Sequence, residues 1–159
     1  MKKFLLTTCL LICAHISFGQ SINVTDSLQI REALLQVFRN FEKPNYDDFS
    51  KISSEVIYCS ICDSRKPKYS SKMSRRKFYR KNLKEIAKYS IWDRASKSNG
   101  IILFKENVGR KTNQLSDITA FITVLEPGEY APGHEGGAIG IQFKKIDGEF
   151  KFSGIETVP

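Results

Sequence analysis

The last third of the chain, from Leu115 to Val158, has the clearest alternation of hydrophobic and polar positions. Apolar side chains recur at every second residue from Ile139 to Phe143 and again at Phe150 and Phe152, which is the period of a strand with one buried face. Asp147 and Gly148 separate the two stretches. Both residue types accept positive φ, as a two-residue hairpin turn requires. The pattern predicts a β-hairpin over residues 137–157.

The N-terminal half shows helical spacing instead. Between Thr25 and Phe41 the apolar residues recur at spacings of four, three, one and three, so they share one stripe of a helix. Asp26 is expected to cap this helix, and Pro44 follows its end. A second, short helix is expected after the cap residue Asn45. A third is expected from the cap residue Ser74 to about Tyr89.

Further strands are expected between and after these helices. Residues 56–61, 101–106 and 116–126 are rich in β-branched and aromatic side chains, whereas residues 63–73 read as a polar loop and residues 127–136 contain too many glycines and prolines for regular structure. The order of elements predicts an α+β fold, in which three N-terminal helices pack on one face of a curved antiparallel sheet of about four to five strands.

The first nineteen residues have the pattern of a secretory signal peptide. Lys2 and Lys3 precede an apolar run over residues 4–16, and small residues lead up to Gly19. We expect cleavage near Gly19, export to the periplasm or the cell exterior, and a single domain over residues 20–159. No later stretch of the sequence is apolar enough to be a transmembrane segment.

The charge of the chain is concentrated in one segment. The formal net charge is +8, yet residues 65–88 alone hold eleven basic residues and one acidic residue. The rest of the chain is therefore mildly acidic. We expect a solvated helix face here, and binding to an anionic surface or polymer is the alternative. The candidates for anion binding are Arg75, Arg76, Lys77 and Arg80.

The order of elements resembles the cone-shaped α+β fold of nuclear-transport-factor-2-like, polyketide-cyclase-like and ketosteroid-isomerase-like proteins, a cystatin-like cone. The resemblance rests on the long first helix and on the closing strands Gly137–Phe143 and Glu149–Thr157, and on no catalytic motif. It implies a sheet that curls around the first helix and leaves an apolar pocket for a small ligand. The expected lining residues are Phe38, Phe121, Ile141 and Phe152.

A possible β-bulge at Ser153 and Gly154 decides what faces that pocket. If one extra residue is inserted there, Ile155 and Thr157 return to the face of Phe152. Without the insertion, Glu156 points to that face instead.

Three residues are candidates for acid–base catalysis, namely His134, Glu156 and Asp117. His134 lies on a glycine-rich loop beside Glu135, and the ordinary pKa of histidine suits proton transfer near neutral pH. Hydrogen bonding within the turn or contact with solvent explains each of these residues more simply. The scattered acids and single remaining histidine show no metal-ligand spacing, so no metal and no cofactor is expected.

Cys59 and Cys62 form a Cys-Ser-Ile-Cys sequence in a chain that is expected to reach an oxidising compartment. Residues three apart on an extended strand are about 10 Å apart, which is beyond the reach of a disulfide. A bridge therefore requires the strand to end near Cys59. Two unpaired thiols, or a redox or metal-binding pair, remain alternatives.

These patterns favour an exported protein that binds a small apolar ligand or a partner and has no recognisable catalytic motif. One alternative is an isomerase-like or cyclase-like enzyme that uses His134 or a pocket carboxylate. Another is an anion-binding surface module built on residues 65–88. The apolar residues on both faces of the stretch 118–125 also suggest that two copies of the chain pair through the sheet.

Overall fold

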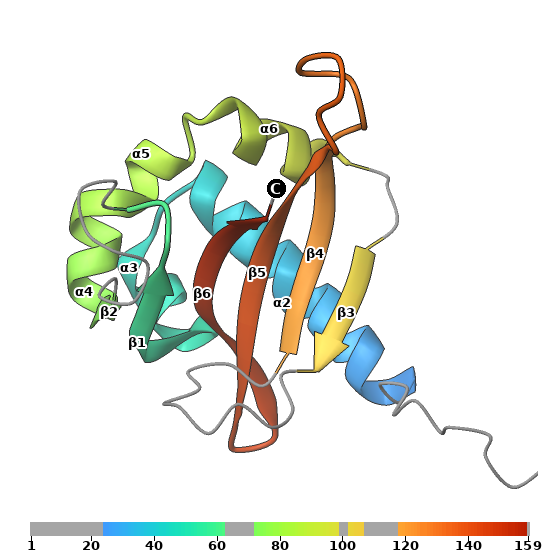
Figure 1. The fold of residues 1–159 in the computed structure, drawn as a ribbon. Coiled ribbons are helices and arrows are strands. Elements are labelled where there is room, and N and C mark those ends of the chain that lie inside the picture. Colours follow the sequence, from blue (N-terminus) through green and yellow to red (C-terminus); the bar gives the residue numbers. More distant parts are fainter. Residues whose placement is uncertain (1–23, 63–71, 99–101, 107–117, 159) are drawn as a thin grey trace, which may run out of the picture.

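A computed structural model describes residues 24–62, 72–98, 102–106 and 118–158 of the chain, and the structural statements below concern these residues (Figure 1). Helices come first and strands dominate the C-terminal half. In chain order the elements are α2 (Val24–Glu42), α3 (Tyr46–Ile52), β1 (Ser53–Cys59), β2 (Lys72–Ser74), α4 (Arg75–Phe78), the π-helical η1 (Tyr79–Leu83), α5 (Lys84–Ile86), α6 (Ser90–Lys97), β3 (Ile102–Glu106), β4 (Ile118–Leu125), β5 (Gly137–Ile146) and β6 (Glu149–Val158).

The strands form one open, curved sheet in the order β2-β1-β6-β5-β4-β3. Neighbouring strands are antiparallel except β1 and β6, which run parallel. The sheet is therefore mixed and has six strands, where the sequence predicted a smaller antiparallel one. The additional strand β2 occupies the end of the expected loop 63–73. Its three residues are too few to show an alternating pattern, so only pairing with β1 reveals it.

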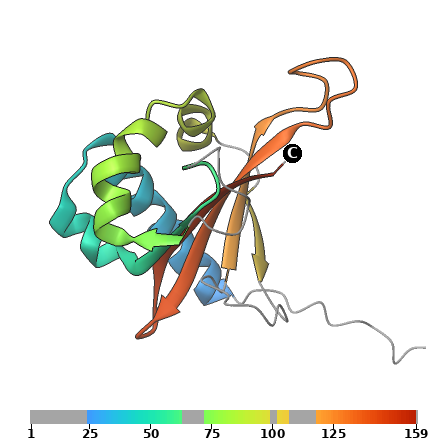
Figure 2. The same ribbon diagram turned by 60° about the vertical axis from the view of Figure 1, so that its left-hand side comes forward.

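The helices cover one face of the sheet, as Figure 2 shows from the side. α2 packs against β6, and α6 packs against β4 and β5. This arrangement confirms the predicted α+β class with helices layered on a curved sheet. The loop between β4 and β5 extends beyond the sheet at one end (Figures 1 and 2).

The apolar stripe of α2 and one face of β4 meet in the core, as their spacing predicted. Ile30, Leu34, Val37, Phe38 and Phe41 on α2 are buried, and so are Ile118, Ala120, Ile122 and Val124 on β4. The centre of this core is aromatic. Phe41 stacks on Trp92 with ring centroids 4.1 Å apart and meets Phe152 edge-on at 6.1 Å. Such pairs contribute about 0.5–1.5 kcal/mol beyond the area they bury.

A β-bulge at Ser153 fixes the faces of β6. Phe143 pairs with Phe152, whereas Gln142 pairs with Gly154, so Ser153 is the extra residue. Phe152 and Ile155 consequently share the core face and are fully buried. Glu156 lies on the opposite face, opposite Gly140. Of the two registers that the sequence allowed, the structure has the one that keeps Glu156 away from the helices.

The local signals for turns and caps agree with the structure except at the start of α2. Asp147 and Gly148 have φ values of 51° and 83°, as the predicted turn requires. The side chain of Asn45 accepts a hydrogen bond from the Asp48 N–H at the start of α3. However, α2 begins at Val24, so Asp26 lies within its first turn. Asp26 is an ion-pair partner of Lys145 instead, at 2.7 Å.

The third predicted helix is divided and shorter than expected. Ser74 caps α4 through the Lys77 N–H, as predicted. The helix then passes through η1 and ends with α5 at Ile86, and a separate helix α6 follows that the sequence did not reveal. Among the described residues, no helix combines the length and the hydropathy that crossing a lipid bilayer requires.

Candidate functional site

A hollow of about 400 Å³ lies beside the start of the α4–η1 helical segment. Its lining consists of a cap serine and four cations. We refer to it as the basic hollow and define it by Ser74, Arg76, Lys77, Arg80 and Lys81.

The amphipathic pattern of the segment gathers these cations on one side. Residues 76 and 77 lie four positions before residues 80 and 81, so they are neighbours across one helical turn. Phe78 and Leu83 are fully buried on the other side. Phe78 packs against the Phe152 ring, with centroids 5.7 Å apart. The buried side chains thus fix the helix and leave the basic ones in solvent.

The basic hollow has no acidic counterpart in the part of the chain that the structure describes. Arg76, Lys77, Arg80 and Lys81 are exposed, and no ion pair joins any of them to a described carboxylate. The acid of this segment, Glu85, pairs with Lys88 at 3.0 Å. Cations in a concave surface reinforce one another's potential and attract anions. Arg guanidinium groups can also bind a phosphate or carboxylate with two parallel hydrogen bonds.

Arg75, the first of the four predicted anion ligands, has a different environment. Its Nη1 donates hydrogen bonds to the carbonyl oxygens of Ser50 at 2.6 Å and Ser53 at 3.0 Å. Both oxygens lie at the C-terminal end of α3, where helix carbonyls lack partners within the helix. Arg75 therefore connects α3 to α4. The other three predicted residues line the basic hollow together with Lys81 and Ser74, which the prediction omitted. Helical spacing could have indicated Lys81, because it lies four residues after Lys77.

Three of the four residues expected to line an apolar pocket lie in the core, and the fourth lies on the other face of the sheet. Phe38, Ile141 and Phe152 are buried in the core between helices and sheet. Phe38 lies edge-on to Trp92, with centroids 5.2 Å apart. Phe121 lies on the other face of the sheet, where it is paired with Gly140. Trp92 on α6, which the sequence analysis did not single out, occupies the space beside Phe38 and Phe41.

The two described candidates for acid–base chemistry lie on different elements of the fold. His134 lies in the β4–β5 loop, where its Nδ1 accepts a hydrogen bond from the Gly136 N–H at 3.0 Å. Glu156 lies on β6, paired with Gly140. Among the described residues, no hydrogen bond or ion pair joins His134 to Glu156. Asp117 lies outside the described residues.

Two surface carboxyl groups have displaced pKa values. The Arg94 side chain donates a hydrogen bond to Glu129 and, with a second one from the Glu126 N–H, lowers the pKa of Glu129 below 4.5. The Lys151 ammonium lowers the pKa of Glu149 in the same way. A general acid needs a raised pKa to stay protonated near neutral pH. The pKa values of Glu129 and Glu149 are instead lowered, as is typical of carboxylates in surface ion pairs. The pair between Arg94 and Glu129 holds the β4–β5 loop against α6.

Cys59 and Cys62 are joined by a disulfide, with Cα atoms 5.5 Å apart. The strand β1 ends at Cys59, and the turn that follows brings Cys62 back within reach. The Ser60 N–H donates to the Ile155 carbonyl at 3.0 Å, which ties this turn to β6. Within the described part of the chain, no group of three or more histidine, cysteine or acidic residues is arranged to hold a metal ion.

Comparison with known proteins provides a likeness at the level of fold. No protein-family model and no curated protein matches the sequence. Among solved structures, a designed NTF2-like protein with five substitutions is similar to this chain, with 11% identity, a TM-score of 0.44 and coverage of 84% of this chain and 99% of that chain. The α+β architecture with its curved open sheet rests on the strands and helices described above, and it agrees with the cone-fold resemblance.

Proposed function

We propose that this protein is a non-catalytic binding protein that holds an anionic partner in the basic hollow. The observation behind the proposal is that four cations line one concave surface without an acidic partner among the described residues. A protein surface usually intersperses charges of both signs. A cluster of one sign, built on a helix whose other face is fixed in the core, favours binding of multivalent anions.

The partner class that fits best is a polymer or surface with closely spaced phosphate, sulfate or carboxylate groups. Arg76 and Arg80 are four residues apart on adjacent turns, so their side chains can bind neighbouring anionic groups. Lys77 and Lys81 would add point charges beside them. Binding of this kind releases condensed counterions from a polyanion, and its affinity falls steeply with salt.

The N-terminal sequence supports a site of action outside the cytoplasm. Residues 1–19 have the pattern of a cleavable signal peptide. The Cys59–Cys62 disulfide is consistent with an oxidising compartment. In the periplasm or outside the cell, anionic lipids and polysaccharides are the abundant polyanions.

We prefer this function to the two others that the sequence suggested. A small apolar ligand would need a cavity where Phe41, Trp92 and Phe152 pack together. An enzyme of the isomerase type would need His134 or Glu156 near a common substrate, and no observation favours that arrangement. Pairing of two copies through the sheet stays a separate prediction.

The test is binding of inorganic polyphosphate over a range of salt concentrations. We expect saturable binding at low salt, with log K falling linearly against log salt. The double variant Arg76→Gln/Arg80→Gln should bind roughly tenfold or more weakly, and its salt slope should be smaller by about two, one for each lost contact.

Lys84→Gln is the matched control, because Lys84 is an exposed cation of the same segment that does not line the basic hollow. It should change binding little. Equal losses from Lys84→Gln and from the double variant would indicate diffuse attraction by the whole segment. The absence of saturable polyphosphate binding at low salt would refute the proposal.

A further inference from the structure

A second concave surface lies between α2 and α3, away from the basic hollow. This α2–α3 cleft has a volume of about 600 Å³. It continues into a hollow of about 420 Å³ that reaches the start of β6, because the two share Gln36, Lys51 and Ile52. The lining of the cleft is Gln36, Arg39, Asn40, Glu42, Lys43, Asp48, Lys51 and Ile52.

The polar face of α2 forms one wall along the whole length. From Gln29 through Gln36 to Lys43, lining residues recur every three or four positions, which is the spacing of one helix face. This face lies beside the apolar stripe that enters the core. Opposite it stand α3 and the β5–β6 hairpin, so the concave surface is elongated and polar.

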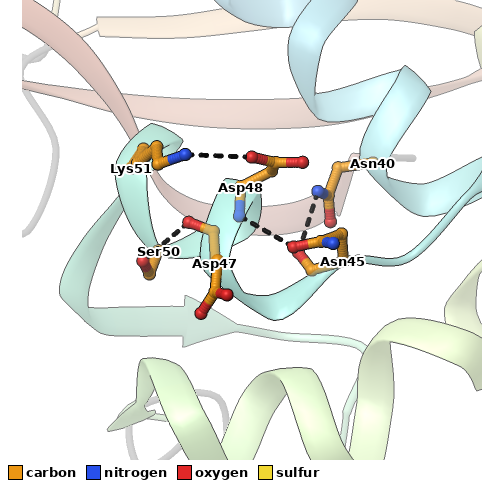
Figure 3. A network of polar contacts seen from close by, with 6 residues as sticks. All are labelled: Asn40, Asn45, Asp47, Asp48, Ser50 and Lys51. Atoms are coloured by element: carbon orange, nitrogen blue, oxygen red, sulfur yellow. Dashed lines mark hydrogen bonds and ion pairs between the residues drawn. The ribbon is translucent and has the colours of Figure 1, made fainter.

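Asn40 has a buried amide with an unsatisfied oxygen. The residue is only 6% exposed, and its Nδ2 donates to the Asn45 carbonyl at 3.2 Å (Figure 3). This bond fixes which end of the amide is the oxygen. Oδ1 has no hydrogen-bond donor, and a buried polar atom left this way costs about 1–3 kcal/mol.

Two cations flank Asn40, one on α2 at Arg39 and one directly after the C-terminal end of α2 at Lys43. Arg39 and Lys43 are exposed, and neither forms an ion pair with a described carboxylate. Lys51, across the cleft, pairs with Asp48 at 3.2 Å (Figure 3). The cleft thus has two positive charges without an acidic partner among the described residues, and between them in the sequence lies a buried acceptor that lacks a donor.

We propose that the α2–α3 cleft binds the carboxyl terminus of an extended peptide. The terminal carboxylate would bind Arg39 and Lys43, and a backbone N–H near the terminus would donate to Asn40 Oδ1. A peptide end has both groups next to each other, as this cleft requires. Oδ1 has no contact with solvent in the unbound protein, so binding requires a local rearrangement that exposes it.

The charge pattern distinguishes this ligand from that of the basic hollow. Glu42 and Asp48 line the α2–α3 cleft together with its cations, and such acids repel a polyanion. A single carboxylate at the Arg39 and Lys43 end avoids them. The preceding residues of the peptide would follow α2 toward Gln29, where polar side chains can pair with its backbone.

The experiment is an NMR titration of the ¹⁵N-labelled protein with acetyl-tetraalanine that has a free carboxylate, compared with the same peptide as its carboxamide. We expect shifts in α2 and α3 and in the side-chain amide of Asn40 with the free acid. The carboxamide should bind roughly tenfold or more weakly, because it lacks the charge-assisted hydrogen bonds.

Arg39→Gln/Lys43→Gln should weaken binding of the free acid to a similar extent, and both substitutions are at exposed positions that should not affect folding. Arg76→Gln/Arg80→Gln, which alters the basic hollow, is the control and should leave this binding unchanged. Equal affinity for acid and carboxamide, shifts confined to other surfaces, or unchanged binding by Arg39→Gln/Lys43→Gln would each overturn the proposal.

Discussion

The Arg75 guanidinium donates a hydrogen bond of 2.6 Å to the Ser50 carbonyl. This bond joins the start of α4 to the end of α3. It also explains why one member of a run of three basic residues turns inward while Arg76 and Lys77 stay in solvent. Arg75 therefore helps to fix the position of the basic hollow, although it does not line the hollow.

Replacing Arg75 with Gln should lower the stability of the fold without removing the basic hollow. The substitution leaves the Ser50 and Ser53 carbonyls without their donor, and each such loss costs about 1–3 kcal/mol. Urea unfolding measures this change. Arg76→Gln, at an exposed neighbouring position, is the control and should stay within about 0.5 kcal/mol of the parent. Equal stability of Arg75→Gln and the parent would contradict the structural role.

Gly154→Ala should destabilise the sheet. A Cβ at this position would lie 2.8 Å from the Tyr58 carbonyl oxygen and 2.4 Å from Gln142 Oε1. The backbone of β1 would have to shift, and overpacking of this kind costs about 1–3 kcal/mol. Gly137→Ala is the matched control, because its nearest atom would be at 3.6 Å. Thermal unfolding should separate the two variants; similar melting temperatures would show that β1 and β6 are not packed this closely.

Reducing the disulfide should lower the melting temperature. The Cys59–Cys62 bridge closes a short loop with a sequence separation of 3, for which the chain-entropy estimate is about 2 kcal/mol. The comparison is thermal unfolding with and without a reducing agent. The double variant Cys59→Ala/Cys62→Ala should melt lower and show no response to the reductant. A parent protein that melts identically in both conditions would contradict a formed bridge.

The ion pair between Glu129 and Arg94 should respond to acid. The Arg94 side chain and then the Glu126 N–H hold the pKa of Glu129 below 4.5. Because folding lowers this pKa, the stabilising effect is present above the unfolded value and is lost as the pH falls through the folded value. An NMR titration of the Glu129 carboxyl group should therefore have its midpoint below 4.5.

Arg94→Gln should raise that midpoint toward 4.5, since it removes the donor. Lys97→Gln, on the same helix and paired with Asp93 at 2.7 Å, is the control and should leave the titration of Glu129 unchanged. If Arg94→Gln left the midpoint where it was, the loop between β4 and β5 would not be held to α6 in this way.

The catalytic candidates show which properties of a residue its type does not reveal. His134 combines a titratable ring with a glycine-rich loop, yet its Nδ1 is engaged by the Gly136 N–H within the same turn. Glu156 is directed by the bulge at Ser153, which reverses the side-chain alternation of β6. Neither hydrogen-bond partners nor pairing register can be read from residue types.

The sequence by itself determined the elements whose signals are local. The α2 stripe, the alternation of β4 and the Asp147-Gly148 turn each depend on residues a few positions apart, so periodicity and turn chemistry suffice to predict them. The basic segment was visible for the same reason. Its residues 76, 77 and 80 also lie together in the structure because helical spacing places them on adjacent turns.

Only the tertiary structure decided the features that depend on distant contacts. The parallel pairing of β1 with β6, the short strand β2 and the place of Trp92 against Phe41 join residues far apart in the chain. The inward turn of Arg75 and the unsatisfied oxygen of Asn40 arise from how α2, α3 and α4 pack. Such contacts are selected by the combined packing of all elements, and no short stretch of sequence contains that information.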